Sequence, residues 1–196
     1  MVDPSDANAA RRAAILESAT AVFLRYGFKK TSMDDLARAA GLSRQGLYLH
    51  YATKDVLFKA AVQHLLESSR AAARAALAGD GADEIELRLM NAFVASHGHM
   101  IGQPGAEHMA ELLATTLQIL GPVFAETEEG FVADLARTLR GAGIAAAWKP
   151  AGISAKDLAE HLHATSYGIK HRVTTAAAYR EQMQVAIKIV CRGAPT

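Results

Sequence analysis

Residues 31–54 read TSMDDLARAAGLSRQGLYLHYATK, and this stretch carries the signals for two short helices joined by a tight turn. Ser32 with Asp35 three residues later is a capping box, which predicts a helix that begins directly after the serine. Gly41 can adopt the left-handed conformation that ends a helix, and Ser43 can cap the helix that follows. Two helices joined by so short a turn cross steeply, so the stretch predicts a helix-turn-helix.

The second of these helices is expected to present polar side chains to DNA. Leu47 and Tyr51 lie four residues apart and face inward, which leaves Arg44, Gln45 and Tyr48 on or near the outer surface. Arg44 and Gln45 are expected to contact bases or phosphates, and among the bases arginine pairs best with guanine and glutamine with adenine. Lys54 begins the next helix, where its charge and the free backbone amides suit a phosphate. The full set of predicted DNA-contacting residues is Thr31, Ser32, Arg44, Gln45, Gly46, Tyr48, His50 and Lys54.

From Ile15 to about Val62 the chain resembles the amino-terminal domain of the tetracycline-repressor (TetR) family. The resemblance is carried by Ile15 to Phe23, Tyr26-Gly27-Phe28, Thr31-Ser32, Ala40-Gly41-Leu42-Ser43, Leu47-Tyr48 and Lys54-Asp55. The chain departs from the usual pattern at Gln45 and Gly46, where a glycine followed by a small or hydroxyl residue is more common. The resemblance therefore implies DNA binding and leaves the operator sequence undefined.

The expected fold is all-α, with about nine helices. No segment shows the two-residue alternation of a strand. We expect a three-helix DNA-binding domain over residues 1–52 and a larger helical domain for ligand binding and dimerisation over residues 53–196. Helical periodicity and breaker residues predict helices over about 9–26, 33–40, 44–51, 54–77, 83–101, 106–120, 122–142, 155–171 and 175–191.

Charge is distributed unevenly along a chain whose net charge is only +1. Residues 1–60 hold nine basic and six acidic side chains, and the remainder holds 12 basic and 14 acidic ones. This asymmetry fits a basic domain that contacts phosphates and a second domain that does not. The single Cys191 excludes an intrachain disulfide, and no secretory or membrane-spanning pattern is present, so we expect a cytoplasmic protein with no membrane partner.

The last two helices carry apolar stripes with two interpretations. The residues are Leu158, Leu162, Ile169, Met183, Ile187 and Val190. They could complete the core of one chain, or they could pack against a second copy as a four-helix bundle. The residues alone leave the choice open, and the resemblance favours the dimer, because TetR proteins dimerise through these helices to read a pseudo-palindrome.

A candidate effector pocket consists of Met90, Phe93, His97, Met100, Met109, Phe131 and Tyr167. The resemblance implies a ligand cavity in this part of the chain, and a lining of this kind favours a hydrophobic or aromatic small molecule. His97 would then be its polar anchor. The same residues would serve equally well as plain core, with His97 a hydrogen-bonded core histidine.

Catalysis, a cofactor and a metal site are not predicted. His97 with His99, and His161 with His163, are two residues apart, whereas helical zinc pairs lie three or four apart. No serine–histidine–aspartate order, phosphate loop or carboxylate pair has a suitable spacing. The predicted function is a homodimeric transcriptional regulator, a repressor released from double-stranded operator DNA by a small-molecule effector. The alternative is a dimeric ligand-binding or metal-dependent enzyme that retains a helical amino-terminal domain.

Overall fold

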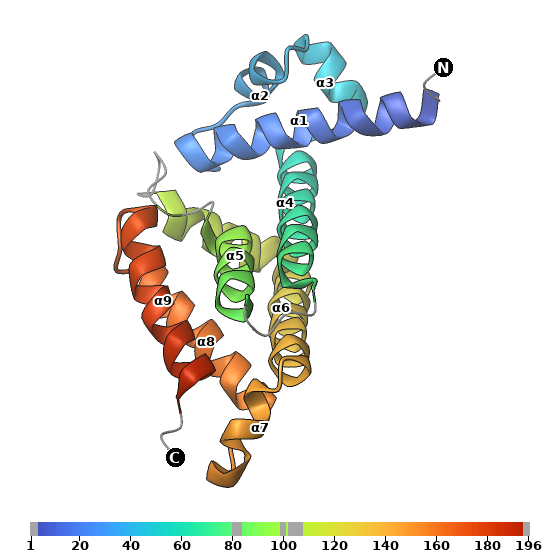
Figure 1. Cartoon of the computed structure of the whole chain (residues 1–196). Coiled ribbons are helices and arrows are strands. Elements are labelled where there is room, and N and C mark those ends of the chain that lie inside the picture. Colours follow the sequence, from blue (N-terminus) through green and yellow to red (C-terminus); the bar gives the residue numbers. More distant parts are fainter. Residues whose placement is uncertain (1–3, 80–83, 99–100, 102–107, 194–196) are drawn as a thin grey trace. The chain divides into compact units, whose positions relative to one another are not determined.

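The computed structural model describes residues 4–79, 84–98, 101 and 108–193 of the 196-residue chain, without the side chains of residues 4, 5, 7 and 109. Within these residues the chain forms helices and no strands, which confirms the predicted all-α fold with nine α-helices. Their bounds are α1 Pro4–Tyr26, α2 Met33–Ala39, α3 Arg44–His50, α4 Lys54–Leu77, α5 Ile85–His97, α6 Met109–Gly141, α7 Ile144–Trp148, α8 Ala155–Lys170 and α9 Ala176–Arg192, with a 3-10 turn at Lys149–Ala151 (Figure 1).

The chain divides into two compact units. The head unit comprises Met1–Ser68 with Gln103–Phe124, and the body unit comprises Ser69–Gly102 with Ala125–Thr196. Each of the helices α4 and α6 therefore contributes residues to both units. The head unit contains more than the predicted DNA-binding domain, because the first part of α4 and the first part of α6 pack into its core.

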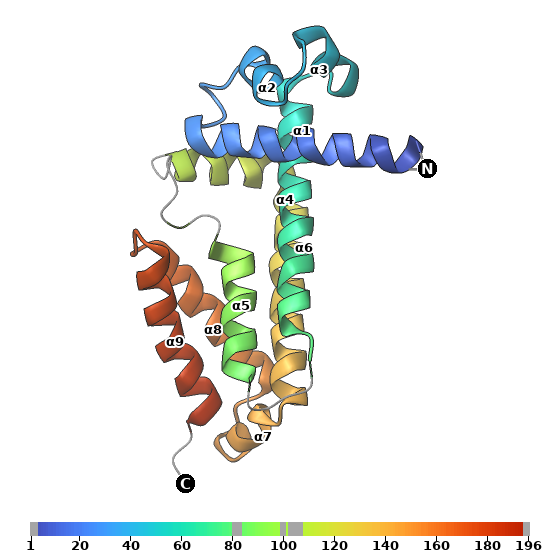
Figure 2. The same ribbon diagram turned by 45° about the horizontal axis from the view of Figure 1, so that its top comes forward.

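The core of the head unit joins α1 to the helix-turn-helix. Figures 1 and 2 show α2 and α3 side by side on one side of α1. The ring of Phe58 makes edge contacts with Phe23 and Phe28, at centroid distances of 5.1 and 4.9 Å. Leu112 of α6 is buried in the same core. This packing holds α2 and α3 on a rigid base.

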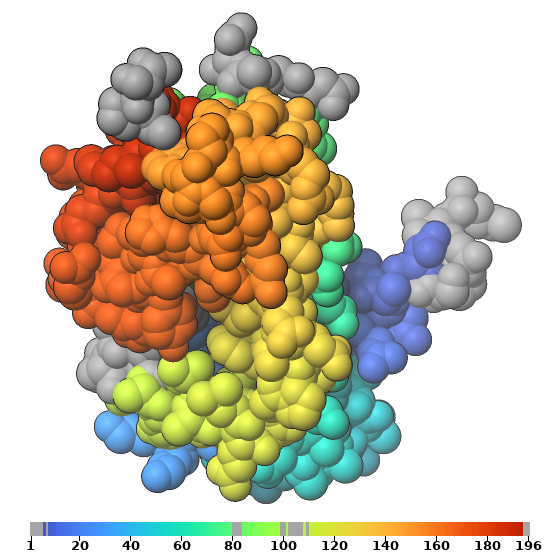
Figure 3. Space-filling view, turned by 90° about the horizontal axis from the view of Figure 1, so that it is seen from below, coloured from blue at the N-terminus to red at the C-terminus, as the bar shows by residue number. Residues whose placement is uncertain are grey.

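The core of the body unit is formed by α5, α6, α8 and α9 together with the end of α4. In Figure 3 the orange residues of α7 and α8 adjoin the red residues of α9 on the surface of this unit. Asp134 is buried at its edge and accepts hydrogen bonds of 2.7 Å from Arg74 and Arg137. Burial disfavours the charged carboxylate, but these two hydrogen bonds outweigh burial and lower the pKa of Asp134.

Two segments differ from the helix predictions. Gly121 and Pro122 were expected to separate two helices, and α6 consists of two helical segments that meet without a loop at a kink at Leu120, whose φ of −132° and ψ of 18° are not helical. Proline lacks the N–H that a straight helix would use, which explains a kink at this place. The expected loop after residue 142 contains the short α7, and Nε1 of Trp148 in this helix donates a hydrogen bond of 2.9 Å to the carbonyl oxygen of Val190.

The six predicted dimer-interface residues lie in the core of the single chain. Their side chains are between 0% and 4% exposed: Leu158, Leu162, Ile169, Met183, Ile187 and Val190. The assignment of these residues to a dimer interface is corrected accordingly, because they are already covered by α5, α8 and α9 of their own chain. A dimer formed through α8 and α9 would use the outward faces of these helices.

No helix within the described residues combines the length and the apolar character that crossing a membrane requires.

Candidate nucleic-acid interface

The helix-turn-helix is fixed by the local hydrogen bonds that its sequence predicts. The hydroxyl of Ser32 accepts from the backbone N–H of Asp35 at 3.2 Å, and the carboxylate of Asp35 accepts from the N–H of Ser32 at 3.1 Å. Gly41 adopts a φ of +65°, a left-handed conformation that side chains disfavour. Ser43 then caps α3 by accepting from the N–H of Gly46 at 3.0 Å. The predicted caps and turn are confirmed.

Gly46 leaves room for this cap. A methyl group at position 46 would lie 3.2 Å from the hydroxyl oxygen of Ser43, which is closer than side-chain carbons normally approach an oxygen. The glycine that departs from the usual family pattern therefore fits the way in which this chain begins α3.

The side chains of α3 divide into a buried and an exposed face. Leu47 is fully buried and Tyr51, directly after the helix, is 3% exposed. The other face carries Arg44, Gln45, Tyr48, Leu49 and His50, all exposed. A helix whose apolar face anchors it to a core, and whose polar face is open, can enter the major groove of DNA.

Arg44 is oriented by two neighbours in the absence of DNA. Its Nε lies 3.2 Å from a carboxylate oxygen of Asp34 in α2, and its guanidinium carbon lies 5.7 Å from the centre of the Tyr48 ring. The interaction with Tyr48, followed by the charge of Asp34, raises the pKa of Arg44. No local sequence pattern predicts that Asp34, ten residues earlier in the chain, would hold this side chain.

Thr31 and Lys54, which the sequence predicts to contact phosphates, have partners within the protein instead. The hydroxyl of Thr31 is buried and donates to the carbonyl oxygen of Gly27 at 2.6 Å. The ammonium group of Lys54 donates to the carbonyl oxygens of Phe28 and Thr31, at 2.9 and 3.0 Å, and lies 4.3 Å from the centre of the Phe28 ring. Both side chains therefore hold the loop between α1 and α2 in place.

We expect Lys54→Met to lower the free energy of unfolding by about 1.5–3 kcal/mol, because hydrogen bonds from a charged donor to buried carbonyls contribute about that much. Methionine keeps the apolar stem over Phe28. Lys59→Met is the matched control, since Lys59 is exposed on the same helix, and it should change stability by less than about 0.5 kcal/mol. Urea unfolding measures both. Equal stability of the two variants, combined with weaker DNA binding by Lys54→Met alone, would restore the phosphate-contact interpretation.

The described members of the predicted effector pocket lie in the body unit. Phe93, His97 and Phe131 are buried against one another, with ring centroids between 5.3 and 6.2 Å apart. Tyr167 is half-buried, and the ammonium of Lys170 lies 4.1 Å from the centre of its ring. Met100 and the side chain of Met109 lie outside the described residues.

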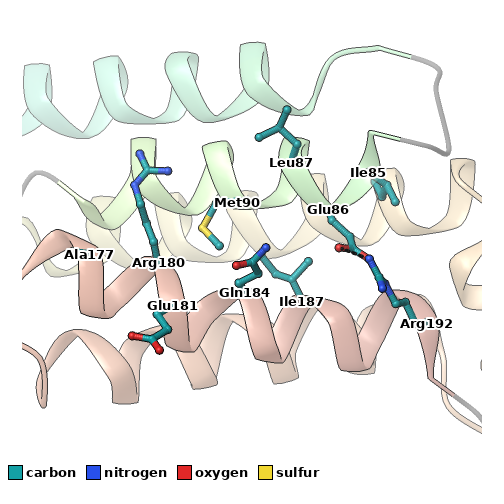
Figure 4. A pocket seen from close by; sticks show the side chains of 10 residues that line it. All are labelled: Ile85, Glu86, Leu87, Met90, Ala177, Arg180, Glu181, Gln184, Ile187 and Arg192. Carbon is teal, nitrogen blue, oxygen red and sulfur yellow. Dashed lines mark hydrogen bonds and ion pairs between the residues drawn. The ribbon is translucent and has the colours of Figure 1, made fainter.

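Met90 also lines a groove between α5 and α9, with a volume of about 730 Å³ (Figure 4). Ile187 and Leu87 provide further apolar surface, and an ion pair of 2.6 Å between Glu86 and Arg192 crosses one end. A volume of this size suits a small organic molecule.

Comparison with known proteins adds to this geometry. Residues 15–61 match the family described as "Bacterial regulatory proteins, tetR family". The HTH-type transcriptional regulator YezE of Bacillus subtilis is 40% identical over 76 residues, which cover 39% of each chain. An HTH-type transcriptional repressor of Mycobacterium tuberculosis is 34% identical over 118 residues, which cover 55% of this chain and 63% of that protein. The chain thus spans less than two thirds of the length of these relatives.

Solved structures resemble the chain over most of its length. A transcriptional regulator from Pseudomonas aeruginosa superimposes with a TM-score of 0.65 at 21% identity, covering 98% of this chain and 93% of that one. SmeT, the repressor of the Stenotrophomonas maltophilia multidrug efflux pump SmeDEF, gives 0.53 at 19% identity, covering 91% of this chain and 87% of its own. SmeT is also known in complex with triclosan. At such identities the likeness is one of fold.

Proposed function

We propose that the chain, whose residues 15–61 match the tetR family of bacterial regulatory proteins, is a homodimeric, sequence-specific DNA-binding regulator of that family that acts in the cytoplasm as a repressor. The observation that carries this proposal is the exposed polar face of α3, supported by the buried Leu47 and Tyr51. The 34% identity over 118 residues to an HTH-type transcriptional repressor of Mycobacterium tuberculosis supports repression as the direction of regulation.

DNA recognition is assigned to Arg44 and Gln45 for bases, with Ser32, Tyr48 and His50 against the DNA backbone. Gly46 adds no side chain to the surface of α3 beside Gln45. Thr31 and Lys54 act indirectly, since their hydrogen bonds fix the loop that leads into α2. The operator is a pseudo-palindrome whose half-sites lie about 34–36 Å apart, or a multiple of this distance.

A small hydrophobic or aromatic effector is proposed to release the DNA by binding the body unit near Met90, Phe93 and Phe131. Its effect would travel along α6. The first part of this helix belongs to the head unit, where the carboxylate of Glu111 accepts a hydrogen bond of 2.8 Å from the N–H of Lys29. The later part carries Phe131 and Leu135 in the core of the body unit. The known complex of the related fold SmeT with triclosan supports an effector of this chemical class.

The dimer is proposed to form through the outward faces of α8 and α9. Val185 and Ile189 lie four residues apart on α9, and each is 56% exposed, which is unusual for large apolar side chains. A second copy would cover both. Two copies would also present two α3 helices to the two half-sites of an operator.

The double change Val185→Glu with Ile189→Glu is expected to convert a dimer into a monomer and to abolish the binding of two chains to one duplex, because four charges would face one another across the interface. Leu87→Glu is the control, since Leu87 is 58% exposed on α5. Sedimentation equilibrium at micromolar concentration, with and without DNA, measures both. A monomeric wild-type chain, or a double variant that still dimerises, would contradict this interface.

A further inference from the structure

Three polar side chains from three helices meet in the body unit. They are His97 at the end of α5, Glu128 in α6 and His163 in α8, and one potential ligand atom of each lies within 4.8 Å of the other two. Nε2 of His163 lies 2.6 Å from a carboxylate oxygen of Glu128. The imidazole rings of His97 and His163 are 5.7 Å apart between centroids.

The surroundings of this cluster are mostly closed to solvent. His97 is 2% exposed, and the side chains of His163 and Glu128 are 19% and 21% exposed. Phe93 and Phe131 lie against the imidazole rings. Burying three such groups is unfavourable unless they are paired or bind a cation, since each loses its contact with water.

A second pair of side chains orients His97. Its Nδ1 lies 2.7 Å from the hydroxyl of Ser166, which in turn lies 2.6 Å from the hydroxyl of Tyr179. Because Nδ1 is engaged by Ser166, Nε2 is the nitrogen that would bind a metal. Histidines that bind metals almost always have their second ring nitrogen held in this way, which fixes the orientation of the ring.

We propose that His97, Glu128 and His163 form a binding site for a divalent transition-metal ion of the zinc type. Two imidazole nitrogens and one carboxylate oxygen are ligands that zinc accepts, and three protein ligands leave a fourth position open. Tetrahedral zinc at about 2.0–2.2 Å from each ligand separates the ligand atoms by about 3.4 Å. The cluster reaches this arrangement when the 2.6 Å separation between His163 and Glu128 lengthens and the widest separation between ligand atoms, which is at most 4.8 Å, shortens. The site does not depend on the proposed DNA binding.

Basic side chains surround the carboxyl group of Glu128. Burial opposes ionisation of this carboxyl group, but the hydrogen bond with His163 and the neighbouring basic groups outweigh it and lower the pKa of Glu128. Lys170 is one of these groups and would compete with a metal, and burial lowers the pKa of its ammonium group.

Titration of the untagged full-length chain with Zn²⁺, in competition with a chromophoric chelator, tests the site. We expect one ion per chain, with Glu128→Gln and His163→Gln each weakening binding by at least about tenfold. The matched controls are Glu129→Gln and His161→Gln, which change exposed neighbours on the same helices and should bind as the wild type does. Circular dichroism verifies that each variant is folded.

Co²⁺ gives a second readout that does not require a variant. A tetrahedral site with nitrogen and oxygen ligands would produce intense visible absorption, which added Zn²⁺ would remove. A wild-type chain that binds neither ion at this stoichiometry would overturn the proposal. Equal binding by His163→Gln and His161→Gln would also overturn it, and would leave the cluster as a metal-free ion pair.

Discussion

Arg44→Ala is expected to weaken binding to the operator of this protein by about 5- to 150-fold. This is the loss that corresponds to one bidentate contact with a base at about 1–3 kcal/mol. The physical reason is the placement of Arg44 at the start of α3, on the exposed face, with a guanidinium group that Asp34 and Tyr48 already orient. The loss should be concentrated on duplexes that carry the preferred base pair, so that discrimination at this position disappears. Fluorescence anisotropy with a matched set of duplexes measures it.

Asp34→Asn separates the DNA contact of Arg44 from its ion pair. This change removes the carboxylate that Arg44 binds in the free protein and leaves the arginine in place. Affinity should be unchanged or higher, since a negative charge near the phosphates is lost. Arg140→Ala, at an exposed position near the end of α6, controls for loss of positive charge in general. If Asp34→Asn weakens binding as much as Arg44→Ala does, the ion pair is the functional element and the base contact is wrong.

Leu47→Ala is expected to lower the free energy of unfolding by about 2–5 kcal/mol, because the side chain is fully buried and its removal leaves a cavity between α3 and the core of the head unit. DNA binding should fall with it, since this residue holds α3 to its base.

Leu49→Ala is the matched control for this prediction. It makes the same chemical change two residues later in the same helix, where the side chain is 83% exposed, and should alter stability by less than about 0.5 kcal/mol. Urea unfolding of both variants gives the comparison. Similar losses in the two would mean that α3 is not anchored through Leu47.

The parts of the fold that depend on neighbours in sequence could be predicted. Ser32 with Asp35 forms the capping box that the three-residue spacing predicts, and Ser154 with Asp157 forms a second capping box of the same spacing. Gly41 adopts the left-handed conformation expected of a glycine at a helix end. Such signals act over one helical turn, so the residues that produce them lie together in the sequence.

The parts of the fold that depend on residues far apart in the sequence could not be predicted. An apolar stripe such as that of Leu158 and Leu162 looks the same whether it packs against its own chain or a second copy, and the structure buries it in its own chain. Lys54 finds its carbonyl partners 23 and 26 residues upstream. Spacing along single helices likewise missed the grouping of His97, Glu128 and His163, because the three residues come from three helices.

The proposal that this chain reads DNA sequence is tested most directly by incubating it with a pool of random duplexes at near-physiological salt and sequencing the molecules that it retains. We predict a two-fold-symmetric motif whose half-sites lie about one helical turn, or a multiple of one turn, apart, and which the Arg44→Ala variant no longer enriches in full. Retention without any motif, which disappears as salt is raised, would contradict sequence-specific binding and leave only non-specific attraction between the basic amino-terminal region and phosphates.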